Sequence, residues 1–203
     1  LYDIFSISAD KQFKQDTSDA LRLYKEPKFT FTEIPLTFKD LVLEGYFQSE
    51  KYFSDCKDTI RKEFTFRNQS TYKVPPGSCS IHVRRGDYLK IQSHHPVCDM
   101  SYYNKAMEMI KADNYLIFSD DPAWCSDNFK GDQFTVVSGN PPTEDMELMS
   151  KCDNNIIANS SFSWWGAWLN SKNAHKVIAP KKWFGNGSPY SAKDIYCEDW
   201  NIL

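Results

Sequence analysis

Ser80-Ile81-His82-Val83-Arg84-Arg85-Gly86-Asp87-Tyr88 is a stretch that changes character halfway along its length. Residues 80–83 form a short run that predicts a buried strand. Two arginines follow directly, and Gly86 then lets the backbone turn sharply. Because a guanidinium group stays charged, it must be paired or solvated where it leaves a core. Two of them at the carboxyl end of a strand predict a site for an anion with several acceptor oxygens, such as a phosphate or diphosphate.

The alternative interpretation of this stretch is purely structural. A salt bridge from Arg84 or Arg85 to Asp87 could fix the turn, because surface ion pairs are common and individually weak. Both interpretations stay open on these residues alone.

Downstream of a polar segment over residues 67–77, strand and helix patterns alternate regularly. The pattern predicts strands at 79–83, 115–118, 134–137, 155–158 and 176–179, and helices at 101–112, 122–128, 144–151 and 162–170. Such alternation is typical of an α/β fold in which helices cover both faces of a parallel sheet. The polar segment, which contains Pro75, Pro76 and Gly77, is the best candidate for a domain linker. Upstream of it, a helix is predicted over residues 50–66.

The predicted topology brings four loops to one edge of the sheet, since ligands of open parallel sheets bind at the carboxyl ends of the strands. These loops are residues 84–87, 119–122, 159–161 and 180–183. Together they carry cations, hydroxyls, carboxylates and an aromatic ring. That combination suits a nucleoside diphosphate.

Two of these loops allow several interpretations. Ser160 or Ser161 could simply cap the helix that begins near Phe162, or the helix start could attract a phosphate. Asp120 and Asp121 could accept the two hydrogens of a guanine edge, bind a divalent metal, or cap the helix that follows.

The tryptophans of the helix predicted at 162–170 are the next ambiguous group. Trp164 and Trp168 share one helical face, and Trp165 lies beside them. Core packing is the common explanation of such a stripe, and a platform for a sugar is the alternative.

Composition excludes several classes of protein. The net charge of -3 and the pI near 5.8 argue against a nucleic-acid partner bound by bulk electrostatics. No apolar run reaches the ~18 residues that a transmembrane helix needs. The six cysteines include no C-x-x-C pair, which disfavours a structural zinc site, and most of them are interpreted as small buried residues in a reducing compartment.

Several motifs of the chain resemble those of one known family. The stretch from His82 to Tyr88, Phe118-Ser119-Asp120-Asp121 and Asn159-Ser160-Ser161-Phe162-Ser163-Trp164-Trp165-Gly166-Ala167-Trp168-Leu169 resemble the motifs of the α-1,2-fucosyltransferase family, glycosyltransferase family 11. Gly45-Tyr46-Phe47-Gln48-Ser49, Val177-Ile178-Ala179-Pro180 and Trp183-Phe184 extend the resemblance over nearly the whole chain.

The resemblance implies a GT-B-like enzyme with two Rossmann-type domains. Residues 1–74 would be the remainder of the N-terminal, acceptor-side domain, and residues 75–203 the GDP-sugar (donor) binding domain. Such an enzyme moves L-fucose, with inversion, from GDP-β-L-fucose to the 2-hydroxyl of a galactose-terminated acceptor glycan. It requires no metal and no cofactor besides the donor substrate.

The resemblance also implies roles for individual residues. The catalytic set would be Arg84, Arg85 and Asp87, with the two arginines on the donor's diphosphate. The donor-binding set would be His82, Asp120, Asp121, Asn159, Ser160, Ser161 and Phe162. Asp87 is the carboxylate nearest to the arginines, yet it could serve only to orient them. The base that deprotonates the acceptor hydroxyl therefore stays open.

Two departures from the family pattern create further expectations. The glycine-rich segment with which the family opens is absent, so we expect a truncated N-terminal domain that lacks roughly fifty residues. The chain could then be a noncatalytic module that binds a nucleotide sugar or a glycan, and another GDP-sugar transferase is a further alternative. Bacterial members work in the cytoplasm or at the cytoplasmic face of the membrane, and animal members in the Golgi lumen, so both locations stay open.

Overall fold

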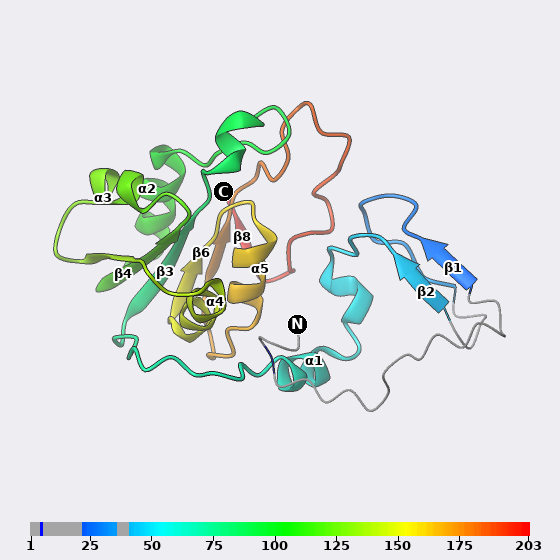
Figure 1. Cartoon of the computed structure of the whole chain (residues 1–203), viewed down its shortest axis with the longest axis horizontal. Helices are drawn as coiled ribbons and strands as arrows, with labels where there is room; N and C mark the ends of the chain where they lie inside the picture. The colour runs from blue at the N-terminus through cyan, green and yellow to red at the C-terminus, as the bar shows by residue number, and fades with distance from the viewer. Residues whose placement is uncertain (1–4, 6–21, 36–40) are drawn as a thin grey trace. The chain divides into compact units, whose positions relative to one another are not determined.

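The protein is described here by a computed structural model that covers Phe5, residues 22–35 and residues 41–203 (Figure 1). The chain forms two compact units. The first consists of Leu1–Thr65 and Tyr190–Cys197, and the second of Phe66–Pro189 and Glu198–Leu203. The division into domains at residues 74 and 75 stays a prediction.

The second unit is built on a six-stranded sheet in the order β5-β4-β3-β6-β7-β8, with every neighbouring pair parallel. The strands are β3 (Ser78–Val83), β4 (Asn114–Ser119), β5 (Phe134–Val137), β6 (Asn154–Ile156), β7 (Val177–Ala179) and β8 (Asn201–Ile202). The helices are η2 (Asp87–Lys90), α2 (Met100–Met109), α3 (Pro122–Asn128), α4 (Pro142–Lys151) and α5 (Ser161–Trp168). The predicted parallel α/β arrangement is confirmed for this unit, which is Rossmann-like.

Helices cover both faces of this sheet, with α2 and α3 on one side and α4 and α5 on the other (Figure 1). Alternate residues of β4 point to opposite faces of the sheet and pack in different clusters. Tyr115 and Ile117 belong to the core cluster that includes α2 and α3, whereas Leu116 and Phe118 pack with α4. Each such large side chain contributes about 1.5–3 kcal/mol when fully buried. The sheet is therefore held from both sides.

The tryptophan stripe of α5 lies in the core. Trp164 and Trp168 are almost fully buried and stacked, with ring centroids 6.2 Å apart, and Trp200 packs on Trp164 at 5.5 Å. A Cβ at Gly166 would lie 3.0 Å from Cε of Met149, so glycine lets α5 approach α4 closely. Core packing, rather than a sugar platform, accounts for Trp164 and Trp168.

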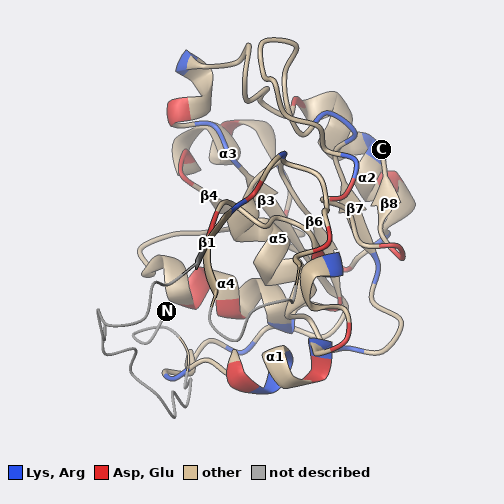
Figure 2. Cartoon of the chain, turned by 90° about the vertical axis from the view of Figure 1, so that its right-hand side faces the viewer, with Lys and Arg blue, Asp and Glu red and all other residues tan. Residues whose placement is uncertain are grey.

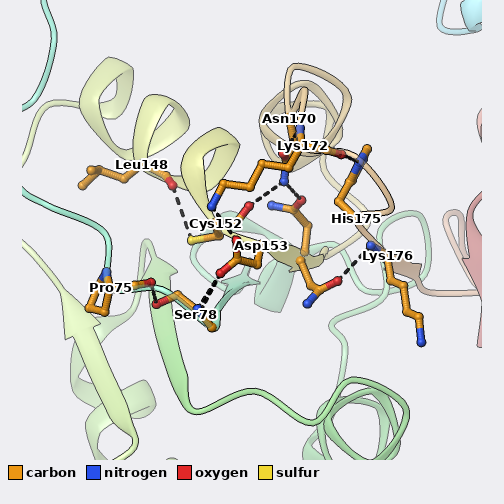
Figure 3. Close-up of polar contacts among 12 residues, drawn as sticks. Pro75, Ser78, Leu148, Cys152, Asp153, Asn170, Lys172, His175 and Lys176 are labelled. Atoms are coloured by element: carbon orange, nitrogen blue, oxygen red, sulfur yellow. Dashed lines mark hydrogen bonds and ion pairs between the residues drawn. The ribbon is translucent and has the colours of Figure 1, made fainter.

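A polar network secures the amino-terminal ends of β3 and β6 (Figure 3). Asp153 accepts hydrogen bonds from the amides of Gly77 at 2.6 Å and Ser78 at 3.2 Å, and from Nζ of Lys172 at 2.6 Å. The Lys172 hydrogen bond is the main reason that the pKa of Asp153 lies below its usual value. Nδ2 of Asn170 donates to the carbonyl of Cys152, and its side-chain oxygen accepts from the amide of Lys172. This edge of the sheet is thus occupied by structural contacts.

The first unit contains β1 (Arg22–Lys25) and β2 (Leu41–Glu44), which pair in parallel, followed by η1 (Glu50–Phe53) and α1 (Lys57–Glu63). The prediction of one continuous helix over residues 50–66 is wrong. The chain leaves its first helical turn at Ser54 and enters α1 only after Cys56, because short polar side chains such as Ser54 and Asp55 favour turns over helix interiors. Figure 2 shows that α1 carries both signs of charge.

The motif at residues 45–49 forms a tight turn in this unit. The carboxylate of Glu26 accepts hydrogen bonds from the amides of Tyr46 at 2.8 Å and Phe47 at 3.2 Å. Phe47 adopts a left-handed φ of 47°, and Oγ of Ser49 accepts from the amide of Lys51 to begin η1. The motif therefore serves at least to shape this turn.

Two expectations from composition can be compared with the structure. Cys79, Cys98, Cys125, Cys152 and Cys197 are buried free thiols and Cys56 is exposed, which confirms that most cysteines are buried. In the described part of the chain no helix is long and apolar enough to cross a membrane.

Candidate functional site at the carboxyl edge of the sheet

The register of β3 and β4 brings the two arginines against the two aspartates. Val83 pairs with Ser119, and these are the last residues of β3 and β4. The residues that follow the two strands therefore leave the sheet side by side. Arg84 reaches Asp120, with Nη1 3.1 Å from Oδ2, and Arg85 reaches Asp121, with Nε 3.0 Å from Oδ2. The loops at residues 84–87 and 119–122 thus meet at one edge, as predicted.

Arg84 is enclosed by acidic and aromatic groups. Besides Asp120, its Nη2 donates to Oδ1 of Asp87 at 2.6 Å. The guanidinium carbon lies 5.2 Å from the ring centre of Tyr88, a cation–π contact. The predicted ion pair between Arg84 and Asp87 therefore exists, next to a second carboxylate.

Arg85 has a different environment. Its guanidinium lies over the ring of Trp124 at 4.1 Å, and Asp121 accepts from Nε. In the part of the chain that the structure describes, no carboxylate pairs with its two terminal nitrogens. Stacking and the Nε contact fix the plane of the group while its terminal edge keeps two donors.

The aspartates have several tasks at once. Oδ1 of Asp120 accepts from the amide of Arg85 at 2.9 Å, and a Cβ at Gly86 would lie 2.5 Å from Oδ2 of Asp120. Oδ1 of Asp121 accepts from the amide of Trp124 at 3.1 Å, which caps α3. This backbone hydrogen bond, followed by the one from Arg85, lowers the pKa of Asp121. Capping is confirmed for Asp121, and guanine recognition stays a prediction.

A metal is the third interpretation of the aspartates. In residues 22–35 and 41–203, no group of three or more His, Cys, Asp or Glu side chains is placed to hold a metal ion.

His82 lies beneath this edge, and one of its ring nitrogens has no hydrogen-bond partner among the residues that the structure describes. The side chain is 5% exposed, its ring centre lies 5.5 Å from that of Phe162, and the nitrogen in question is the buried Nδ1. Burial, and then the charge of Arg84, lower the pKa of His82 to about 3. The imidazole is therefore neutral at physiological pH and can offer a lone pair or an N–H to a bound group.

The low pKa of His82 predicts that stability depends on pH. Between pH 6.5 and about pH 3 the unfolded chain binds a proton at this residue and the folded chain does not. The free energy of unfolding should therefore fall by about 1.4 kcal/mol for each pH unit below 6.5 on account of this group. Urea unfolding at pH 7.0, 6.0 and 5.0 measures the slope.

The control for this prediction separates His82 from other titrating groups. His82→Gln should flatten the slope, whereas His94→Gln, which changes an exposed histidine in the loop after η2, should leave it close to wild type. Equal slopes in wild type and His82→Gln would contradict the assignment.

Asn159 connects three loops of this edge from a buried position. Its Nδ2 donates to the carbonyls of Pro96 and Trp183, both at 2.9 Å, and its Oδ1 faces the thiol of Cys98 at 3.7 Å. Its own carbonyl accepts from the hydroxyl of Tyr88 at 3.2 Å. Asn159 is 1% exposed, so the structure gives its amide a role in positioning loops.

The loops after β3 and β7 also touch through their backbones. The amide of Gly185 donates to the carbonyl of His94, and that of Gly187 to the carbonyl of Ser93, both at 2.8 Å. A Cβ at Gly185 would collide with the carbonyl of Ser93, so the approach requires glycine.

The start of α5 completes the edge. Ser160 is the N-cap residue, but its hydroxyl makes no capping hydrogen bond, and Ser161 is exposed in the first turn. Hydroxyl capping of this helix, one of the two interpretations of these serines, is therefore absent at Ser160. Helix starts of this kind favour anions.

Two contributors were not identified from the sequence. Trp124 stacks on Arg85, and Tyr88 links Arg84 to Asn159 while its ring stacks on His95 at 4.8 Å. For Trp124, the sequence did offer a signal: it stands three residues after Asp121, the cap of α3, and therefore in the first turn of a helix that begins at this edge. Tyr88 stood inside the opening motif without an assigned role.

Comparison with known proteins agrees with this picture. The sequence model described as Glycosyl transferase family 11 matches residues 3–203. The chain belongs to glycosyl transferase family 11. The family match confirms the resemblance carried by the motifs at residues 82–88 and 159–169.

Individual members of glycosyl transferase family 11 show how far the similarity extends. The O-antigen biosynthesis glycosyltransferase WbnK of Escherichia coli is 37% identical over 162 residues, which are 74% of this chain and 51% of that protein. An alpha-1,2-colitosyltransferase of Escherichia coli is 37% identical over 69% of this chain and 55% of its own length. Galactoside alpha-(1,2)-fucosyltransferase 1 of Bos taurus is 30% identical over 64% of this chain and 43% of that protein. The chain spans about half the length of the curated relatives it matches, and no solved structure matches it.

Proposed function

We propose that this protein transfers L-fucose from GDP-β-L-fucose to the 2-hydroxyl of a galactoside, with inversion and without an obligatory metal ion. We further propose that its second unit is the donor-binding domain of a GT-B enzyme. The observation that carries the proposal is the pair Arg84 and Arg85 at the carboxyl edge of a parallel sheet, in a chain of this family.

The chemistry of transfer explains why guanidinium groups are suited to this position. As the bond between the sugar and the diphosphate breaks, negative charge grows on the leaving diphosphate and the sugar becomes oxocarbenium-like. Arg84 and Arg85 are fixed by Asp120, Asp121 and Trp124, so they need little reorganisation to stabilise that charge. A metal ion has this task in other transferases, and the arginines would replace it here.

The other residues of the edge complete the proposed donor site. Ser160, Ser161 and the start of α5 would face the phosphates, Phe162 and the neutral His82 would lie near the nucleotide or the sugar, and Asp120 or Asp121 near the guanine. Asn159 would hold the surrounding loops in place.

The names of the relatives make two donor sugars candidates for this protein, colitose and fucose. Two of the relatives are named for colitosyl and for fucosyl transfer, at 37% and 30% identity respectively. We propose fucose as the donor sugar on the motif resemblance, and competition between GDP-fucose and the corresponding colitosyl donor discriminates the two.

Transfer of labelled fucose from GDP-fucose to lactose, with and without a chelator, tests the proposal. Product in both reactions supports it, and loss of product on chelation would overturn the metal-free mechanism. GDP binding without any transfer would favour a noncatalytic binding module, which the limited coverage of the relatives makes the second candidate.

A further inference from the structure

The two arginines differ in what occupies their terminal nitrogens. Both Nη atoms of Arg84 face carboxylates, Asp87 at 2.6 Å and Asp120 at 3.1 Å. Arg85 is paired through Nε, and in the described residues its terminal nitrogens meet no carboxylate. A diphosphate could therefore bind Arg85 directly, whereas at Arg84 it meets a carboxylate already placed at each terminal nitrogen.

The two carboxylates on Arg84 are not equally fixed. Asp120 also accepts the amide of Arg85 and is packed against Gly86, and its side chain is 26% exposed. The side chain of Asp87 is 61% exposed, and Arg84 is the one hydrogen-bond partner of its carboxylate in the described part of the chain. Asp87 is therefore the carboxylate that an incoming anion can replace.

We infer that Asp87 occupies the place of a donor phosphate on Arg84 until the donor binds, and that the displaced carboxylate then takes the proton of the acceptor hydroxyl. This inference rests on the proposed function. It gives the reaction an order, because Asp87 becomes a free base only after the diphosphate has replaced it.

The transfer step balances with these groups alone. The acceptor oxygen forms a bond to C1 of the sugar while the bond between C1 and the diphosphate oxygen breaks, and that electron pair stays on the diphosphate. The hydroxyl proton moves to the carboxylate of Asp87, and Arg84 and Arg85 neutralise the leaving group. Inversion places the acceptor hydroxyl on the face of C1 opposite the diphosphate, so the carboxylate released from Arg84 has to turn toward that face to take the proton.

The inference predicts opposite effects of one substitution on binding and on turnover. In the full chain, Asp87→Asn should bind GDP about two- to fivefold more tightly, since a partly exposed competing ion pair is lost. The same variant should lower kcat by about 10²–10⁴-fold, the usual contribution of a general base. Calorimetric titration with GDP and transfer from GDP-fucose to lactose measure the two quantities.

Three controls keep the outcome interpretable. Asp127→Asn changes an exposed aspartate of α3 that pairs weakly with Lys130 at 3.8 Å, and it should leave both quantities unchanged. Asp87→Glu retains the carboxylate and should recover part of kcat, with GDP affinity near wild type. Thermal unfolding shows whether each variant is folded, which is expected for such an exposed side chain.

The contrary results are equally specific. Weaker or unchanged GDP binding by Asp87→Asn would show that Asp87 orients Arg84 instead of competing with the donor, and an unchanged kcat would remove it as the base. If neither wild type nor Asp127→Asn binds GDP, the proposed donor is wrong. This outcome is distinct from a failure of the inference about Asp87, in which wild type binds GDP and only the behaviour of Asp87→Asn differs from the expected one.

Discussion

Replacing Arg85 with alanine is expected to lower fucose transfer by about 10²–10³-fold, the usual cost of losing one preorganised donor to a developing oxyanion. The reason lies in how Arg85 is held. Trp124 supports the face of its guanidinium at 4.1 Å and Asp121 fixes Nε at 3.0 Å, so its terminal nitrogens are held at the edge of the sheet before any ligand arrives. The measurement is kcat/KM for GDP-fucose with saturating lactose.

A conservative substitution sharpens this prediction. Arg85→Lys keeps the positive charge but loses the planar group that stacks on Trp124 and donates through two nitrogens, so it should recover only a part of the activity. Lys111→Ala removes an exposed cation elsewhere on this unit and should leave kcat/KM unchanged. Full activity in a folded Arg85→Ala protein would refute the assignment of this residue to the diphosphate.

Replacing Asn159 with alanine is expected to have the largest effect on stability. The carbonyls of Pro96 and Trp183 each lose the buried amide of Asn159 as a donor, at roughly 1–3 kcal/mol per lost donor, so the free energy of unfolding should fall by about 2–6 kcal/mol. Chemical unfolding followed by tryptophan fluorescence measures this loss, and the loops after β3 and β7 should become more accessible to proteases.

A matched asparagine controls for the general cost of such a substitution. Nδ2 of Asn128 donates to the carbonyl of Trp124 at 2.8 Å, but on the surface, where water replaces the lost donor. Asn128→Ala should therefore change the free energy of unfolding by no more than about 0.5 kcal/mol. Similar losses in the two variants would mean that Asn159 does not act as a buried connection.

The parallel sheet was predictable because its central strands are short apolar runs separated by helices with clear periodicity. β8 was missed, since two residues, Asn201 and Ile202, carry no pattern. The helix expected over residues 50–66 failed because periodicity continued through Ser54 and Asp55, where local turn preference prevailed.

The candidate site was predictable to the extent that adjacent parallel strands end at one edge. That rule brought Arg84 and Arg85 to Asp120 and Asp121. It could not assign the partners of Asn159, because Pro96 lies 63 residues away in the sequence and their contact depends on how the loops fold over the edge. The pairing of individual carboxylates with individual nitrogens is likewise a property of side-chain geometry alone.

The backbone contact between Gly185 and the loop at Ser93 and His94 has a consequence for engineering these two loops. If only one of the two loops were replaced by that of another family member, its backbone would not match the hydrogen-bonding groups of the other loop. Chimaeras should therefore exchange both loops together. Libraries that diversify this rim should keep Gly185 and Gly187 constant and vary exposed neighbours such as Leu89 and Ile91.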